Sequence, residues 1–426
     1  MNNETRAATP LRLEAVPDDG CHLLTVSHPR LETEHADSDS ARVLIAGDLW
    51  CPHDDPLATE PDRVPWASLV PFMRSHDVAV VNLEAPVSPA LPDDPKSGPR
   101  LRSHARTADA VRAGGFTAVS LANNHLRDAG DRGVLDTLAA CDAAGLAVVG
   151  GGADERTASA PLVLDLGVCR LGILAAAERE FSIAGADRPG AAPLEPYSTP
   201  ARVLELRAHT DAVVALVHGG NEFYSLPSPR LKRMAHALVA CGANAVVCHH
   251  QHVYSGVEIS GGAVIVYGTG NFYFPPRFSR DPRWRRGYAV RLTVGKGGVK
   301  GLGLLPYRQS DPRPVVQSLE ERELTHVASD ILALSDTLRD DPALRREWSR
   351  FCARQRTRYL SRALGLTRLE RAAFERGVWP FWRLRRSELP TLLNLFTCEA
   401  HHETMTTILE AELAASSSRT LQEASR

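Results

Sequence analysis

The sequence predicts an α/β fold whose strands form one mixed sheet or two sheets packed face to face, followed by a helical extension. Two observations support this prediction. Five short apolar runs each stop at polar residues, and amphipathic stretches long enough for crossover helices separate several of them. From about residue 311, dense arginine at helical spacing replaces these runs.

The apolar runs predict buried strands because they are rich in β-branched residues and end abruptly. They are RVLIAGD (42–48), VAVVNLE (78–84), FTAVSLANNH (116–125), AVVALVHGG (212–220) and NAVVCHHQH (244–252). Helices are expected at 103–114, 131–144 and 228–241, and such crossovers join parallel strands. Glycine turns within 161–174 and 253–267 predict antiparallel hairpins, which makes the strands mixed.

These patterns divide the chain into three segments. Residues 1–40 are polar and are expected to be a loosely ordered lead-in. Residues 41–310 contain the strand-like runs and are expected to form the main, metal-binding domain. Residues 311–426 are expected to be an arginine-rich helical extension, which packs on the main domain, covers its site or flanks it with positive charge.

The composition narrows the class of protein. A net charge of -2 over 426 residues offers no basic field for nucleic acid. The eight cysteines are scattered without a C-x-x-C pair, which favours reduced thiols in the cytoplasm. The start of the sequence has no signal-peptide pattern, and no apolar run approaches the roughly 20 residues that span a bilayer. We therefore expect a cytoplasmic protein with a small-molecule substrate and no membrane partner; its oligomeric state is left open.

Every strand-like run ends in residues that can bind a metal ion. Because ligand sites in α/β sheets form at the carboxyl ends of strands, five distant segments are expected to meet at one edge. Their terminal polar residues are Asp48, Asn82, Glu84, Asn123, Asn124, His125, His218, His249, His250 and His252. One such histidine alone is more often a hydrogen-bonded structural residue, but five segments with the same arrangement favour a metal site.

The residue types fit a pair of divalent transition metals. Carboxylate, amide oxygen and imidazole suit iron, zinc or manganese, and one carboxylate can bridge two ions about 3.5–4 Å apart. His250 and His252 can reach neighbouring ions if the backbone there leaves regular strand geometry. His249 points the other way and is expected to support the ligands from behind.

Five ordered motifs resemble a known family. AGD, VNLEAPVS, LANNHLRDAG, VHGGNEFYSLPS and CHHQHVYSGVEISGGAVIVYGTGNFYF, within residues 41–275, are similar to the CapA-like (poly-γ-glutamate capsule biosynthesis) proteins. That family resembles the calcineurin-type metallophosphoesterases. The resemblance implies a calcineurin-like α/β/β/α sandwich and a role in capsule biosynthesis, although the missing membrane anchor argues against a role outside the cell.

The resemblance also implies roles for single residues. Glu84 would be the bridging carboxylate, and His125 would be the acid/base histidine. The metal ligands would be Asp48, Glu84, Asn124, His218, His250 and His252, with Asn82, Asn123, Asp128, Glu222 and His249 supporting them. Phosphoesterases of this fold usually have D-x-H where this chain has Asp48-Leu49-Trp50, so the first ion has only Asp48, Glu84 and His252. Two alternatives stay open: this ion is bound weakly, or His53, Asp54 or Glu222 completes its site.

Three functions fit such a site. In the first, two metals assist hydrolysis of a phosphoryl or acyl bond while His125 protonates the leaving group. In the second, which we narrowly favour from sequence, the metals are iron and open positions bind dioxygen; the resemblance then extends to dinuclear non-haem iron monooxygenases of natural-product pathways, which need a reductant or redox partner. The third is a non-catalytic scaffold that has lost a metal.

An arginine cluster follows the last motif. Arg277, Arg280, Arg283, Arg285 and Arg286 lie in PPRFSRDPRWRRG (275–287) and are expected to emerge near the site. Guanidinium groups bind phosphate in a bidentate manner, so the cluster predicts a phosphorylated or acyl-coenzyme A substrate. A solvated arginine loop explains the pattern equally well.

Overall fold

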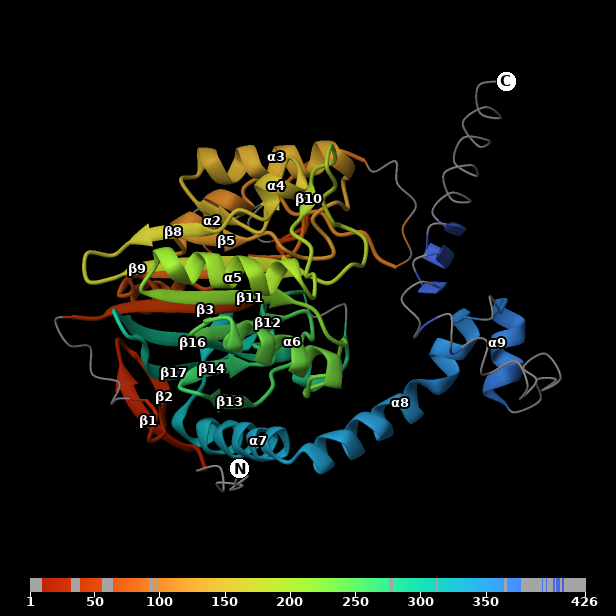
Figure 1. The fold of residues 1–426 in the computed structure, drawn as a ribbon. Coiled ribbons are helices and arrows are strands. Elements are labelled where there is room, and N and C mark those ends of the chain that lie inside the picture. Colours follow the sequence, from red (N-terminus) through yellow and green to blue (C-terminus); the bar gives the residue numbers. More distant parts are fainter. Residues whose placement is uncertain are drawn as a thin grey trace. The chain divides into compact units, whose positions relative to one another are not determined.

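The computed structural model describes residues 10–31, 39–55, 64–91, 96, 98–275, 279–311, 313–363 and 366–376, with single positions between 393 and 409 (Figure 1). The chain divides into two compact units, Met1–Trp348 and Ser349–Arg426. The second unit contains the later part of α8 (Asp341–Ala363) and α9 (Arg368–Glu375). The first unit contains the sheets and the candidate site.

One sheet of the first unit is parallel in one half and antiparallel in the other. Its order is β1 (Arg12–Asp18), β2 (Cys21–Ser27), β17 (Gly298–Gln309), β16 (Arg286–Gly295), β3 (Ala41–Leu49), β4 (Val78–Leu83), β5 (Ala118–Ser120) and β6 (Ala147–Val149). The strands from β3 to β6 are parallel, whereas β16 is antiparallel to β3 and β17 is antiparallel to β16. Short strands β15 (Asn271–Tyr273) and β18 (Val316–Ser318) pair with β3 and β17.

The second sheet has a parallel centre and an antiparallel hairpin at each edge. Its order is β13 (Val257–Ser260), β14 (Ala263–Val266), β12 (Ala245–His249), β11 (Ala212–His218), β9 (Arg170–Ala177) and β8 (Leu162–Asp165). The edge pairs β8·β9 and β13·β14 are the two hairpins predicted from the glycine turns, which confirms that prediction. A separate small pair joins β7 (Gly151–Gly152) and β10 (Gly190–Ala191).

Helices cover both sheets. On the second sheet, α5 (Ser198–His209) contacts β9 and β11, and α6 (Pro229–Ala240) contacts β12. On the first sheet, α3 (Gly130–Ala143) contacts β6 and also α2 (Thr107–Ala113). The predicted helices at 103–114, 131–144 and 228–241 are therefore present as α2, α3 and α6. Shorter helical segments are η2 (Ala67–Leu69), α1 (Val70–Arg74), α4 (Glu155–Ala158) and η4 (Pro282–Arg285).

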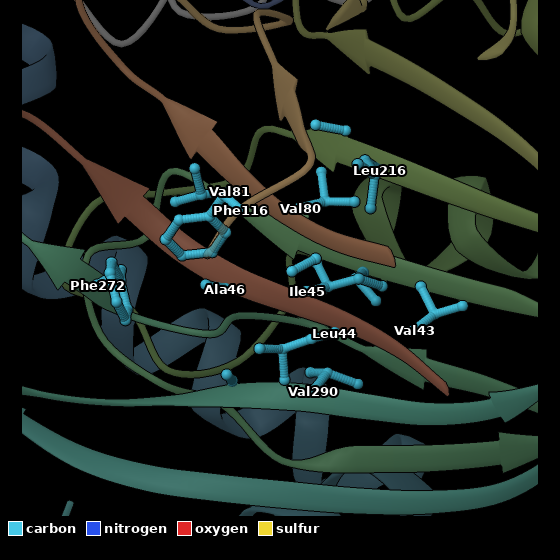
Figure 2. Close-up of a cluster of buried hydrophobic side chains, with 14 of the residues drawn as sticks. Val43, Leu44, Ile45, Ala46, Val80, Val81, Phe116, Leu216, Phe272 and Val290 are labelled. Carbon is cyan, nitrogen blue, oxygen red and sulfur yellow. The ribbon is translucent and has the colours of Figure 1, made fainter. Parts of the chain in front are cut away.

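The hydrophobic core lies between the two sheets. Ile45 of β3, Val80 of β4 and Leu216 of β11 are each about 1% exposed and belong to one buried cluster (Figure 2). Full burial of an aliphatic side chain of this size contributes roughly 1.5–3 kcal/mol, so the cluster holds the sheets together face to face. This arrangement confirms the predicted α/β/β/α sandwich with mixed sheets. Among the described residues, no helix combines the length and the apolar character needed to cross a bilayer.

The N-terminal segment differs from the prediction. Residues 1–40 were expected to be loosely ordered, but β1 and β2 form an antiparallel pair, and β2 joins the large sheet beside β17. The reason is that Leu23, Leu24 and Val26 of β2 are buried, which outweighs the polar character of the segment as a whole. Strand β1 is the exposed outer edge.

The first helix of the predicted extension packs on the sandwich. α7 (Glu321–Arg339) contacts β1, β2 and β13. Its Ser335 hydroxyl accepts a hydrogen bond from the Val257 backbone N–H at 2.9 Å, and Tyr254 donates its hydroxyl proton to Asp330 at 3.0 Å. α7 therefore lies against the segment that follows His252. The boundaries 41–310 and 311–426 remain predictions.

Candidate dinuclear metal site

The candidate ligands come from the carboxyl ends of strands in both sheets. Asp48 lies at the end of β3, Glu84 follows β4, and His218 ends β11. His250 and His252 follow β12 directly, and Asn124 follows β5. All six side chains are buried, at 7% exposure or less. The convergence expected from five distant segments is therefore present, and it involves both sheets.

The acidic and histidine ligands form two groups that share one residue. Glu84, His218 and His250 place ligand atoms within 4.8 Å of one another, and Asp48, Glu84 and His252 do the same. Glu84 Oε1 lies 3.7 Å from His218 Nε2 and 3.8 Å from His252 Nε2. These distances exceed hydrogen-bond length and suit two ligands of one ion, since metal–nitrogen bonds are about 2.0–2.1 Å.

Glu84 provides the test of whether the site fits a metal. Its side chain is fully buried, and within the described part of the chain neither carboxylate oxygen has a hydrogen-bond partner. Nδ1 of His250 is likewise buried without one. Buried polar atoms are nearly always paired, and a buried carboxylate needs a compensating charge. A pair of cations at Glu84 supplies that charge, so the residues fit two metal ions.

The backbone at the histidines leaves strand geometry. His250 has φ of 95° and His252 has φ of 56°, both in the left-handed region that residues other than glycine rarely adopt. Such conformations cost about 1–3 kcal/mol each and persist where the surroundings enforce them. With this backbone conformation, His250 and His252 face different ligand groups although they are two residues apart, which agrees with the irregular backbone predicted from sequence. His249 instead contacts the Ala46 carbonyl oxygen through Nε2 at 3.0 Å.

Neighbouring amides fix Asp48 and His252. Asn82 donates from Nδ2 to Asp48 Oδ1 at 2.7 Å, and the His250 backbone N–H donates to Asp48 Oδ2 at 3.2 Å. Nδ1 of His252 lies 2.8 Å from Asn271 Oδ1, so this ring nitrogen donates and Nε2 stays available to a metal. Asn271 reaches this place because β15 pairs with β3, where it lies opposite Asp48.

Asn124 turns its amide oxygen toward the group formed by Glu84, His218 and His250. Its Oδ1 lies 3.1 Å from His218 Nε2, and its Nδ2 donates to Glu180 at 2.5 Å. An ionised carboxylate accepts hydrogen bonds and cannot donate them, so Glu180 binds the NH₂ end of the Asn124 amide. The amide oxygen of Asn124 therefore faces the ligand group. Asn123 lies behind and donates to the Leu83 carbonyl oxygen at 2.9 Å.

His125 is held from one ring nitrogen. Its Nδ1 lies 2.5 Å from Asp128 Oδ2, and Asp128 also accepts from Lys96 and from the Leu101 backbone N–H. The imidazole is 7% exposed. With Nδ1 engaged by Asp128, Nε2 is the ring nitrogen that remains available to other groups.

Burial dominates the proton equilibria of the site. It raises the pKa of Glu84 well above its ordinary value, and the charge of Asp48 raises it further. Burial lowers the pKa of His218 and of His252, so both imidazoles favour the neutral form that binds a metal. Burial also lowers the pKa of His125, although its hydrogen bond to Asp128 acts in the opposite direction.

An aromatic wall borders the Asp48 group. Trp284 packs 4.7 Å from the His252 ring and Phe274 packs 5.1 Å from it. Trp50, at the position where the D-x-H pattern has histidine, packs on Phe274 and donates from Nε1 to the Arg102 carbonyl oxygen. Phe223 stacks on Trp284. Position 50 thus contributes to the wall.

Other predicted residues lie outside the two ligand groups. Glu222 is exposed, and its charge acts on Glu84 and His252. His53 and Asp54 are exposed and belong to neither group.

The arginine cluster is mostly engaged in ion pairs. Arg283 pairs with Asp281, Arg285 with Asp311 at 2.8 Å, and Arg286 lies 4.0 Å from Glu323. Arg280 is exposed, and Arg277 lies outside the described residues. These pairs favour the solvated-loop explanation, and anion binding remains a prediction. The buried Trp284 within this segment does reach the site.

Comparison with known proteins assigns most of the first unit to one family. The family model described as "Bacterial capsule synthesis protein PGA_cap" matches residues 42–276, more than half of the chain. The chain belongs to this family. The match covers every candidate ligand and His125.

Curated relatives of the PGA_cap family carry names that refer to capsule or polymer biosynthesis. "Capsule biosynthesis protein CapA" of Bacillus anthracis is 28% identical over 268 residues, which cover 60% of this chain and 64% of that protein. "PGA biosynthesis protein CapA" of Bacillus subtilis is 29% identical over 269 residues, covering 60% of this chain and 69% of that protein. The chain thus matches about two thirds of the length of these relatives.

Solved structures show weaker similarity. A hypothetical protein from Thermus thermophilus is 19% identical with a TM-score of 0.40, covering 63% of this chain and 99% of that chain. A structure described as a novel phosphatase from Mycoplasma pneumoniae is 12% identical with a TM-score of 0.41, covering 67% of this chain and 96% of that chain.

Four contacts of the site were not predicted from sequence. They involve Lys96, Glu180, Asn271 and Trp284. Asn271 stands in the GTGNFYF run, and its place at the start of a short strand after glycines was an available signal. Lys96 and Glu180 lie in connecting segments without periodicity, so nothing in the local sequence marks them.

Proposed function

We propose that this chain is a dinuclear metalloenzyme that hydrolyses a phosphoryl or acyl bond. The observation that carries the proposal is the position of Glu84, whose unpaired buried carboxylate is shared by a group with His218 and His250 and a group with Asp48 and His252. A shared carboxylate between two ligand groups is the arrangement of two-metal hydrolytic sites. The names of the curated relatives refer to capsule and PGA biosynthesis, and they support a substrate from the synthesis of such a polymer.

In this proposal one set of residues binds the metal ions, and His125 transfers a proton. Asp48 and His252 would hold one ion, His218, His250 and Asn124 the other, and Glu84 both. When bound, the two ions polarise the substrate oxygen and lower the pKa of a bound water. Asp128 holds His125 by Nδ1, so Nε2 takes a proton and returns it to the leaving group. The buried walls exclude other water from the reacting bond.

A second candidate is oxidation of an apolar substrate with iron in the same site. Two observations favour it. Glu84, His218 and His250 form a two-histidine, one-carboxylate group, which is typical of non-haem iron oxygenases. Trp50 replaces a further ligand of the Asp48 group, and the adjoining wall is aromatic. This function requires a reductant that delivers electrons from outside the chain.

Metal analysis combined with two assays tests both candidates. The protein is purified from cells supplied in turn with manganese, zinc and iron, and bound metal is measured by mass spectrometry. Hydrolysis predicts about two ions per chain and turnover of a chromogenic phosphoester or acyl ester without oxygen or reductant. Oxidation predicts iron and substrate-dependent oxygen uptake with reductant. Full-length protein that binds no transition metal would refute both candidates.

The His125→Gln variant separates catalysis from metal binding. It should keep both ions, because His125 is in neither ligand group. It should lower hydrolytic turnover by about 10²- to 10⁴-fold, the range contributed by a positioned acid or base. Unchanged turnover would contradict the role of His125 in hydrolysis.

A further inference from the structure

Lys96 lies beside His125 although it is distant from the family motifs. Its side chain is 6% exposed, and its ammonium group donates to Asp128 Oδ1 and to the Asn124 carbonyl oxygen at 3.2 Å. It also lies 3.1 Å from His125 Nδ1, and the ring of Phe181 covers it at 5.1 Å. The ammonium group therefore points into the turn that carries Asn124 and His125.

Asp128 links Lys96 to the imidazole. Its side chain is fully buried, and its two oxygens have different partners. Oδ1 accepts from Lys96, whereas Oδ2 accepts from the Leu101 backbone N–H at 2.7 Å and faces His125 Nδ1 at 2.5 Å. A buried carboxylate is costly without a counter-charge, and Lys96 is a cation that touches it. The ammonium group thus fixes the carboxylate that orients the ring.

We propose that Lys96 is a positioning residue that holds the His125 imidazole and the Asn124 turn in the geometry used at the metal site. Lys96 acts through Asp128 and the Asn124 carbonyl oxygen and does not touch the reacting atoms. A residue that hydrogen-bonds to the ligands of a metal site, without binding the metal itself, typically contributes about 10- to 100-fold to activity. In its kinetic form the proposal rests on the hydrolytic function proposed above.

The kinetic test compares Lys96→Met with Lys96→Arg in the metal-loaded enzyme. Lys96→Met should lower kcat by about 10- to 100-fold, leave KM within about twofold, and leave metal content unchanged. Lys96→Arg should recover much of kcat, because guanidinium keeps the charge and several donors. Lys296→Met, on an exposed turn, is the matched control and should behave as the wild type. Wild-type kcat in Lys96→Met, or a fall matched by metal loss, would overturn the proposal.

A spectroscopic test does not depend on turnover. The proton on Nδ1 of His125, in a short hydrogen bond to a buried carboxylate, gives a downfield nuclear magnetic resonance signal that His125→Gln removes. This signal should disappear or move upfield in Lys96→Met and persist in Lys296→Met; an unchanged signal in Lys96→Met would contradict positioning through Asp128. If the wild type has no hydrolytic activity but the signal still changes in Lys96→Met, the hydrolytic function is refuted and the positioning role is supported.

The uncompensated Asp128 in Lys96→Met could impair folding, so Lys96→Gln is measured in parallel. The amide keeps donors for Asp128 and the Asn124 carbonyl oxygen without placing a charge. In the folded Lys96→Gln protein, kcat should fall less than in Lys96→Met, with the signal broadened or shifted. Values of kcat and signal equal to wild type in Lys96→Gln would show that the charge has no role and overturn the proposal.

Discussion

Oε1 of Glu84 lies 3.8 Å from Nε2 of His252, although the two residues come from different sheets. The same oxygen lies 3.7 Å from Nε2 of His218. Neither distance is a hydrogen bond, and the Glu84 carboxylate has no hydrogen-bond partner among the described residues. One carboxylate therefore faces the imidazoles of both ligand groups, and the site depends on it more than on any single histidine.

Removal of Glu84 is expected to remove both ions. In Glu84→Ala each group loses its shared ligand, and the remaining residues, Asp48 with His252 and Asn124 with His218 and His250, bind metal weakly without the bridging carboxylate. Metal content measured by mass spectrometry after gel filtration should fall from about two ions per chain to near zero.

Glu258→Ala is the matched control for this experiment. Glu258 is a partly buried glutamate on β13 that belongs to neither group, and its loss should leave metal content unchanged. Full metal occupancy in Glu84→Ala would show that the ions, if bound, are held elsewhere.

Single histidine variants are expected to remove one ion each. His252→Ala leaves Glu84, His218, His250 and Asn124 in place, so the second ion should remain. His218→Ala leaves Asp48, Glu84 and His252, so the first ion should remain. In each variant the content should be about one ion per chain.

With manganese, electron paramagnetic resonance should change from the spectrum of a coupled pair to that of a single ion. If either variant loses both ions, or keeps both, the two groups are not separate sites.

The convergence of the candidate ligands could be predicted from sequence because strand ends in both sheets carry chemically similar residues. Asp48, His218 and His250 each stand where a β-branched run stops, and this position alone brings them to one edge. The need for irregular backbone at His250 and His252 also followed from their spacing, and their positive φ values confirm it.

What the sequence did not reveal depends on long-range contacts. Lys96 reaches Asp128 from a segment without periodicity, and Glu180 meets Asn124 from another sheet's loop. β1 escaped prediction because it is an exposed edge strand with Pro17 and several charges, a composition that edge strands tolerate. In these cases the partner, and not the local pattern, determines the structure.

Gly47 is expected to tolerate no side chain. A Cβ at this position would lie 1.9 Å from the Gly270 carbonyl oxygen and 3.1 Å from the Phe272 backbone nitrogen. Gly47→Ala must therefore push β3 away from β15, which displaces Asp48 and Asn271. Such overpacking costs about 1–3 kcal/mol or more, so the melting temperature should fall and binding of the first ion should weaken.

Gly297→Ala controls for the loss of glycine itself. A Cβ at Gly297 meets nothing within 4 Å, and the change should leave both the melting temperature and metal content as in the wild type. Equal stability of Gly47→Ala and wild type would contradict the close packing of β3 against residues 270–272.

Glu258 is expected to make the stability of the fold depend on pH. Burial raises the pKa of its carboxyl group, but the His236 imidazole 3.1 Å away, the charge of Lys232 and the hydrogen bond from Tyr267 together lower it more, so the pKa lies below its ordinary value of 4.5. A group with a lower pKa in the folded chain stabilises the fold above 4.5, and this contribution is lost as pH falls through the folded value.

The Glu258→Gln variant measures this contribution by urea unfolding of metal-free protein. At pH 7 it should be less stable than wild type by about 1.5–3 kcal/mol, the range for hydrogen bonds to a charged group, and the difference should shrink as pH falls below 4.5. Glu205→Gln on the exposed face of α5 is the control and should match wild type at both pH values. A difference that stays constant across this range would mean that packing of the side chain, and not its charge, stabilises β13 against α6.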